Sequence, residues 1–179
     1  MLLKSRCESD ELKKLRSLNI RMELTAKDKF NYLNLEKGYA GEVKFDQITE
    51  DLREERFIIH DLLLEVNHSY FQIDTLIISQ GVIHPLDVKN HEDDCSLQSD
   101  KLYSVKTGRE YKNPIIQLNR SATLFRQLLQ NHKLNYLVES FVIFIHPEFT
   151  LYQAPKDLPI ILPTQLNRFL KDLNKTPLN

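Results

Sequence analysis

Three charged residues lie within two apolar, strand-like runs near the middle of the chain, Asp74 in the first run and Asp87 and Lys89 in the second. The Gln80-Gly81 dipeptide between the runs is typical of a hairpin turn. Side chains alternate between the two faces of a strand, so Asp87 and Lys89 are expected on one face, roughly 7 Å apart. Pairing of the two strands would therefore bring both acids and the lysine to one place.

Carboxylates that converge away from water repel each other, and one of them must protonate unless a cation lies between them. A small number of oxygen ligands with room for water suits Mg²⁺ or Mn²⁺. A lysine beside such a site can steady an activated hydroxide or a phosphate oxygen. The two runs by themselves favour equally a second interpretation, in which the acid and the lysine form a structural pair on an edge strand.

The composition is that of one soluble globular domain. The chain has 179 residues, of which 41% are hydrophobic, and its formal net charge is -1. This length supports a substantial core, and the net charge gives no overall argument for nucleic-acid binding. No apolar run reaches the length of a membrane span. Two cysteines, Cys7 and Cys95, provide no disulfide framework, which favours a reducing cytoplasm.

The order of the predicted elements indicates an α/β fold with a central mixed β-sheet flanked by helices. Capping residues and apolar stripes predict helices over residues 5–18, 25–35, 42–52, 113–129 and 164–173. Strands are predicted over residues 57–66, 71–79, 82–90, 141–145 and 150–152, and a small hairpin over residues 102–111. Residues 91–100 are interpreted as a loop.

Two residues near the acids have more than one interpretation. Pro85 cannot donate a ladder hydrogen bond, so we expect a bulge or an edge position just before Asp87. Glu42 opens a helix after Gly38 and Gly41, which break the preceding helical pattern. Its carboxylate is either an acid favoured by the helix dipole or a third acid directed at the candidate metal site.

A basic segment follows the acids. Residues 101–133 contain seven basic residues and one acid, Glu110, for a local net charge of +6. Such a run is usually a solvated face, but beside a candidate metal site it also favours a phosphate-binding surface. The candidates for nucleic-acid contact are Lys101, Lys106, Arg109, Lys112 and Arg120.

Four short motifs occur in order along the chain: Gly-Tyr-Ala-Gly-Glu at 38–42, Gln-Ile-Asp at 72–74, Asp-Val-Lys-Asn at 87–90 and Asn-Pro-Ile-Ile-Gln at 113–117. In their order and spacing these motifs resemble the nuclease-related domain family. That family is assigned to the PD-(D/E)xK nuclease superfamily, whose restriction-endonuclease-like sheet carries two acids and a lysine around Mg²⁺. The family usually has Glu before the lysine, whereas this chain has Asp87.

The resemblance implies a metal-dependent deoxyribonuclease that hydrolyses phosphodiester bonds in DNA. It implies a catalytic centre in which three acids hold Mg²⁺ or Mn²⁺, a lysine assists and two glutamines support: Glu42, Asp74, Asp87, Lys89, Gln72 and Gln117. Residues 1–36 are expected to form an N-terminal helical extension and residues 37–179 the nuclease-related domain. Further domains or partner proteins are typical of the family, a homo-oligomer is an additional option, and no membrane partner is expected.

Two other functions stay open at this point. Asp87 and the interruption at Pro85 are also compatible with a nucleic-acid-binding module that has lost catalysis. The modest net charge and the N-terminal helices are compatible with a protein-interaction domain. Binding of DNA in the absence of metal, and its cleavage in the presence of metal, distinguish the three functions.

Overall fold

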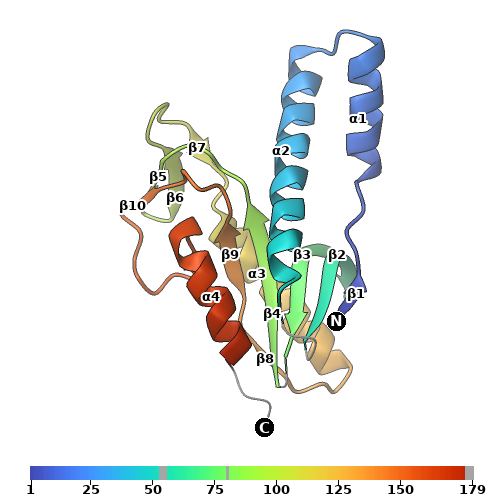
Figure 1. Ribbon diagram of the computed structural model, residues 1–179, viewed down its shortest axis with the longest axis vertical. Coiled ribbons are helices and arrows are strands. Elements are labelled where there is room, and N and C mark those ends of the chain that lie inside the picture. The colour runs from blue at the N-terminus through green and yellow to red at the C-terminus, as the bar shows by residue number, and fades with distance from the viewer. Residues whose placement is uncertain (53–55, 80, 176–179) are drawn as a thin grey trace.

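The computed structural model of the chain describes residues 1–52, 56–79 and 81–175 (Figure 1). The helices are α1 (Asp10–Arg21), α2 (Ala26–Thr49), α3 (Pro114–Asn131) and α4 (Pro163–Lys175). The longer strands are β2 (Phe57–Val66), β3 (Ser69–Ile78), β4 (Val82–Lys89), β5 (Cys95–Gln98), β6 (Lys101–Ser104) and β9 (Phe141–Phe144). The shorter strands are β1 (Leu2–Lys4), β7 (Glu110–Tyr111), β8 (Leu137–Val138), β10 (Leu151–Tyr152) and β11 (Ile160–Ile161).

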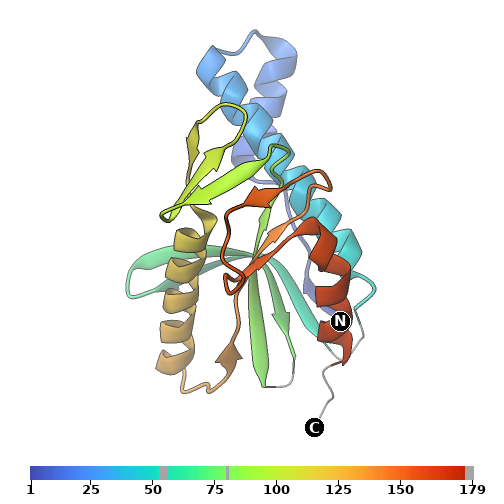
Figure 2. The same ribbon diagram turned by 90° about the vertical axis from the view of Figure 1, so that its left-hand side faces the viewer.

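The described strands form two sheets. The larger sheet is mixed and has the order β1-β2-β3-β4-β9-β11, with β8 also beside β4, while β10-β5-β6-β7 form the smaller one. Helices α2 and α4 pack on one face of the larger sheet, and α3 packs on the other (Figures 1 and 2). The predicted α/β architecture, a central mixed sheet flanked by helices, is confirmed.

Helix α2 is one continuous helix, so the predicted break at the glycines is wrong. Thr25 caps it as expected, because its side chain accepts a hydrogen bond from the Asp28 N–H at 3.1 Å. Gly38 and Gly41 lie inside it, where packing of the helix against the sheet outweighs their low helix propensity. The predicted boundary between residues 36 and 37 falls within this helix, and the division into two domains stays a prediction.

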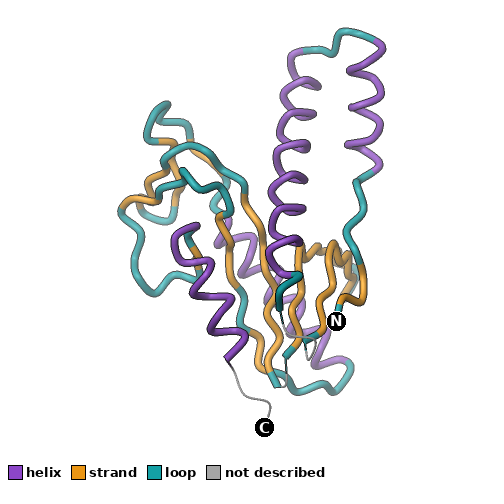
Figure 3. Tube along the Cα trace, in the orientation of Figure 1, coloured by secondary structure: helices purple, strands orange, loops and turns teal. Residues whose placement is uncertain are grey.

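Helix α1 begins later than predicted. Its N-cap is Ser9, whose Oγ accepts from the Leu12 N–H at 3.2 Å, and not Ser5. The preceding residues instead add β1 in parallel to β2, with Leu2 opposite Ile58. Helices α1 and α2 then form a hairpin that projects beyond the larger sheet (Figure 3). None of the helices within the described residues is long and apolar enough to cross a membrane.

Pro85 lies in an interior strand and not at a bulge or an edge, so that expectation is wrong. Its register with β3 is regular, with Pro85 opposite Leu76. On the other side of β4 the parallel partner changes: the pairing with β8 ends at Ile83, and the pairing with β9 starts at Leu86. The proline therefore falls in the break between two parallel ladders, where a missing N–H removes the least.

Of the other local predictions, some are confirmed and one is wrong. Asn113 caps α3, with Pro114 at the first helical position, and the predicted apolar stripe of α3 is buried. The predicted loop over residues 91–100 is wrong, because β5 lies within it and pairs with β6. Cys95 in β5 is fully buried, and the strand covers the hydrophobic cluster under the smaller sheet. The predicted hairpin turn includes Gln80, which lies outside the described residues, while Gly81 has a φ of +76°.

Candidate active site

Asp74 lies where the ladder between β3 and β4 ends. The two strands pair in a regular antiparallel register up to Thr75 opposite Leu86. Beyond that pair a side chain replaces the backbone acceptor, because Asp74 Oδ2 accepts a hydrogen bond from the Val88 N–H at 2.8 Å. A carboxylate thus occupies the end of the ladder, directly beside β4.

Asp87 and Lys89 lie on the same face of β4, close to Asp74, as their spacing predicts. The Lys89 Nζ atom donates to Asp87 Oδ1 at 2.8 Å. Asp87 is only 8% exposed, and its second oxygen, Oδ2, is buried without a hydrogen-bond partner in the described part of the chain. A buried carboxylate oxygen with no partner is costly, so this atom indicates that a further donor or a cation belongs beside it.

The charges of this group oppose one another. Burial, together with the negative charges of Asp87 and Glu42, raises the pKa of Asp74 to about 8 against the opposing effects of Lys89 and of the Val88 hydrogen bond. Burial disfavours the charged form of Lys89, but the Asp87 and Asp74 carboxylates outweigh burial and raise the pKa of the lysine above its ordinary value. The lysine is therefore a fixed cation and not a base at neutral pH.

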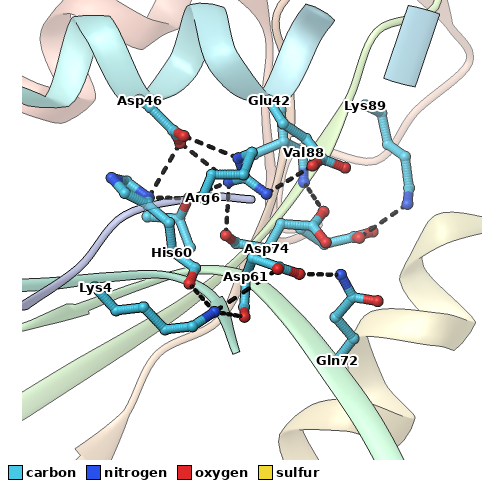
Figure 4. A network of polar contacts seen from close by, with 12 residues as sticks. Lys4, Arg6, Glu42, Asp46, His60, Asp61, Gln72, Asp74, Val88 and Lys89 are labelled. Atoms are coloured by element: carbon cyan, nitrogen blue, oxygen red, sulfur yellow. Dashed lines mark hydrogen bonds and ion pairs between the residues drawn. The ribbon is translucent and has the colours of Figure 1, made fainter. Parts of the chain in front are cut away.

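Glu42 reaches the same place from α2 (Figure 4). Together with Asp74 and Lys89 it lines a cleft of about 370 Å³. Arg6 holds its carboxylate, with 2.6 Å between Nη1 and Oε2, and the same guanidinium binds Asp46, one turn further along α2, at 2.8 and 3.0 Å. Burial raises the pKa of Glu42, and the positive charges of Arg6 and Lys89 oppose that rise.

A close contact between α2 and the end of β4 sets the position of Glu42. A Cβ atom added to Gly41 would lie 2.5 Å from the Cβ atom of Asn90. The Asn90 Nδ2 atom in turn donates to the Lys37 carbonyl at 2.9 Å. Because Asn90 directly follows Lys89, this contact places the acid on the helix against the lysine on the strand.

The N-terminal segment supports an interruption in the sheet beside the site. Asp61 has a φ of +51°, and it breaks the β2–β3 ladder opposite Asp74. Lys4 donates to the carbonyl groups of His60, at 3.0 Å, and Asp61. Arg6 Nη2 donates to the Asp74 carbonyl at 2.8 Å. These two cations satisfy carbonyl groups that the interrupted ladder leaves without backbone partners.

Both predicted glutamines lie at the site. Gln72 lines the cleft beside Asp74, and its Nε2 atom donates to Asp61 Oδ1 at 2.8 Å. Gln117, in the first turns of α3, shares with Gln72 and Asp87 a cavity of about 10 Å³. That volume is about the space of one water molecule. The two amides therefore lie where they can hold water or a phosphate oxygen next to Asp87.

Sequence reasoning missed the roles of Arg6 and Asp46. Asp46 follows Glu42 by one helical turn, and this spacing could have indicated a second acid on the same face of α2. No sequence signal distinguishes Arg6 from the other basic residues of the N-terminal segment. Its role depends on β1 adding to the edge of the sheet, which the sequence does not reveal.

The five predicted nucleic-acid contacts have different surroundings. Lys101 pairs with Glu110 at 3.1 Å, and the Arg109 guanidinium lies 5.3 Å from the ring centre of Phe30 on α2. Lys106 is exposed near the turn between β6 and β7. The other two predicted contacts, Lys112 and Arg120, line a groove beside α3.

The residues present fit a hard divalent cation with few protein ligands. Asp74 and Asp87 are close enough for the charge of one to raise the pKa of the other, and Asp87 Oδ2 has no partner among the described residues. Glu42, in contrast, is paired with Arg6. No group of three or more His, Cys, Asp or Glu side chains within 1–52, 56–79 and 81–175 is arranged to hold a metal ion. The arrangement corresponds to two carboxylates with water as the remaining ligands.

Comparison with protein families assigns the chain. The model of the nuclease-related domain family matches residues 37–145, which is more than half of the sequence. The chain belongs to this family. The nuclease-related domain is of the general PD-(D/E)xK kind, and the matched segment contains all six candidate catalytic residues, whereas Lys4 and Arg6 precede it.

Among solved structures, the nuclease-related domain described here is similar to protein VC1899 from Vibrio cholerae, with a TM-score of 0.37 and 10% sequence identity. The similarity covers 92% of this chain and 50% of that protein, so the chain spans half the length of this relative. Comparison with curated proteins found no match.

Proposed function

We propose that this nuclease-related domain is a metal-dependent nuclease that hydrolyses phosphodiester bonds in DNA. The observation that carries the proposal is the pair of neighbouring carboxylates on β3 and β4: Asp74 lines the cleft together with Lys89, and the buried Asp87 binds the ammonium group of the same lysine at 2.8 Å. The two carboxylates repel each other, and Asp87 Oδ2 has no hydrogen-bond partner among the described residues. A cation bound between them would stabilise this arrangement. Membership of a nuclease-related family supports the same reaction class.

Each residue has a role that follows from its position. Asp74 and Asp87 would hold Mg²⁺ or Mn²⁺, and Glu42 would contact the cation directly or through water. When bound, such a cation lowers the pKa of a water molecule and polarises the phosphate. The permanently charged Lys89 would orient the attacking water and stabilise negative charge that develops on the phosphate oxygens.

The glutamines complete the site in this proposal. Gln72 and Gln117 flank Asp87 and would hold water or a phosphate oxygen. Water adds to phosphorus while the bond from phosphorus to the leaving sugar oxygen breaks, and that oxygen takes up a proton. Asp61 and Arg6 act indirectly, because they fix Gln72 and Glu42 through hydrogen bonds of 2.8 and 2.6 Å.

Incubation with plasmid and linear DNA tests the proposal. The wild-type protein is expected to cleave DNA with Mg²⁺ or Mn²⁺ and not with EDTA, and Lys89→Ala and Asp74→Ala are each expected to abolish cleavage. Lys44→Ala, which removes the same charge from an exposed position of α2, is the matched control and should cleave normally. Circular dichroism establishes that the variants are folded. Cleavage that survives in both site variants would refute the assignment.

One observation favours a second candidate function. Because Arg6 occupies Glu42 and no cluster of three acids is present among the described residues, the chain is also compatible with a nucleic-acid-binding module without catalysis. Such a module binds DNA equally well in EDTA and in Mg²⁺ and never nicks a supercoiled plasmid. Preparative amounts of protein, with Mn²⁺ as well as Mg²⁺, separate this function from a slow nuclease.

A further inference from the structure

A groove of about 540 Å³ lies between the start of β3 and the first turns of α3. Helix α3 packs against β2 and β3 on the face of the larger sheet opposite α2 and α4 (Figure 2). Four residues give the groove its chemical character: Tyr70, Lys112, Ile116 and Arg120. The roles assigned above to the catalytic centre use none of these four side chains.

The groove is continuous with the candidate active site. Gln72 lines both the groove and the cleft that contains Asp74 and Lys89. Gln72 and Gln117 also line the small cavity next to Asp87, and both belong to the wall of the groove. A chain-like ligand lying in the groove would therefore pass the two glutamines and reach the carboxylates.

The charge of the groove is positive and uncompensated. No acidic residue belongs to its lining. Neither Lys112 nor Arg120 has an ion-pair or hydrogen-bond partner within the residues that the structure describes, whereas Lys101 is paired with Glu110. Unpaired cations on a concave surface attract phosphate groups, and their attraction depends strongly on salt.

The apolar part of the lining distinguishes between kinds of nucleic acid. Tyr70 and Ile116 are each 63% exposed, although both are large apolar side chains. Flat, exposed apolar surfaces next to cations contact the faces of bases, and these faces are free in a single strand and stacked inside a duplex. The combination is typical of surfaces that bind single-stranded nucleic acid.

We propose that this groove binds a single strand of DNA and leads it to Asp74 and Asp87. Lys112 and Arg120 contact the phosphates, Tyr70 and Ile116 support the bases, and Gln72 marks the passage from the groove to the cleft. This inference rests on the proposed nuclease function for the meaning of the cleft. Single-strand binding itself requires only the groove.

The test measures binding without cleavage. Fluorescence anisotropy in EDTA is recorded with a labelled single-stranded oligonucleotide and with a blunt duplex of the same length. The wild-type protein is expected to bind the single strand more tightly. Tyr70→Ala should weaken single-strand binding at least about fivefold. The double variant Lys112→Ala/Arg120→Ala should reduce the slope of log affinity against log salt by about 1.4, which corresponds to two phosphate contacts.

Matched controls keep the experiment specific to the groove. Arg168→Ala and Lys171→Ala remove the same two types of charge from exposed positions of α4, on the opposite face of the larger sheet, and should leave affinity within about twofold, since a solvated charge outside the site contributes little. Tyr70→Phe keeps the ring and should bind like the wild type. All of the substituted side chains are exposed, and thermal melting checks that each variant is folded.

The outcomes separate this inference from the nuclease proposal. Equal or tighter binding of the duplex, or an effect of Lys171→Ala as large as that of the groove variants, would overturn the proposal that the groove binds a single strand. If the groove variants bind normally while Lys89→Ala abolishes cleavage, the groove is refuted and the nuclease stands. Loss of single-strand binding in the groove variants of a protein that never cleaves DNA supports the groove and refutes the nuclease.

Discussion

Asp74 is held in surroundings that disfavour its charge. Among the described residues its carboxylate accepts one backbone hydrogen bond, from Val88 at 2.8 Å, while burial and the Asp87 and Glu42 carboxylates raise its pKa from 3.8 to about 8. Arg6 is nearby but binds Glu42 and the Asp74 carbonyl group, not the Asp74 carboxylate. Perturbed carboxylates of this kind are concentrated at functional sites.

Neutralising this residue should stabilise the protein in the absence of metal. Because the pKa of Asp74 is higher in the folded than in the unfolded chain, protonated Asp74 contributes to the free energy of unfolding. This contribution is fully present below pH 3.8 and is lost as the pH rises through about 8. Asp74→Asn is therefore expected to raise Tm in EDTA, by an amount that grows between these pH values and then levels off. A gain of about 1 kcal/mol corresponds to about 2–4 °C for a chain of this size.

Thermal melting in EDTA across this pH range measures the effect. Asp51→Asn is the control, since Asp51 is exposed after α2, and the Tm of this variant should follow that of the wild type. An Asp74→Asn protein that is less stable than the wild type at neutral pH would show that the carboxylate is well compensated in the fold. The argument for a cation at this place would then fail.

Among the secondary-structure elements, helix α2 positions the acids that do not come from the sheet. It brings Glu42 and Asp46 to the sheet on one face, and it can approach β4 closely because Gly41 has no side chain. Gly38, one turn earlier, has no other atom within 4 Å of an added Cβ. Both glycines thus lie inside the same helix, but Gly41 is tightly packed whereas Gly38 faces open space.

A paired substitution exploits this contrast. Gly41→Ala forces a clash with Asn90 and should cost about 1–3 kcal/mol, and it should also reduce activity because Glu42 shifts with the helix. Gly38→Ala meets open space and should stabilise the protein by up to about 1 kcal/mol through helix propensity. Urea denaturation compares the two variants. Equal effects of the two substitutions would mean that the contact between α2 and β4 does not constrain the helix.

The elements also show what the sequence can and cannot predict. The strand signals of β2 to β4 and the cap at Asn113 are local, and the structure confirms them. The continuity of α2 was mispredicted because glycine propensity is a local cost that tertiary contact overrides. The position of Arg6 could not be predicted for a different reason. It depends on β1 pairing with β2, a strand that lies 56 residues further along the sequence. Convergence of Asp74, Asp87 and Lys89 was predictable because one hairpin carries all three.

At the scale of the whole molecule, the candidate site collects residues from parts of the chain that fold onto different faces of the sheet. Helix α2 and the N-terminal segment supply Glu42 and Arg6 from one side, and α3 supplies Gln117 from the other. The hairpin of β3 and β4 lies between them and carries the acids. A ligand held by Glu42, Gln117 and the two hairpin carboxylates would therefore couple α2 and α3 to the hairpin between them.

Binding of a divalent cation should consequently stabilise the entire fold. A ligand at about 100 times its dissociation constant contributes about 2.7 kcal/mol to a protein that binds it only when folded, so Mg²⁺ or Mn²⁺ is expected to raise Tm by several degrees. Asp74→Asn and Asp87→Asn should each abolish the shift, because each removes one of two anionic ligands. Differential scanning fluorimetry, with Ca²⁺ and matched NaCl for comparison, measures the Tm shift without reference to activity.

A control variant tests whether the shift is specific to the two carboxylates. Because Asp46 binds Arg6 and lies outside the cleft lining, Asp46→Asn should lower the Tm measured without metal yet keep the metal-induced shift. A metal shift that is unchanged in both site variants would place the cation elsewhere on the molecule.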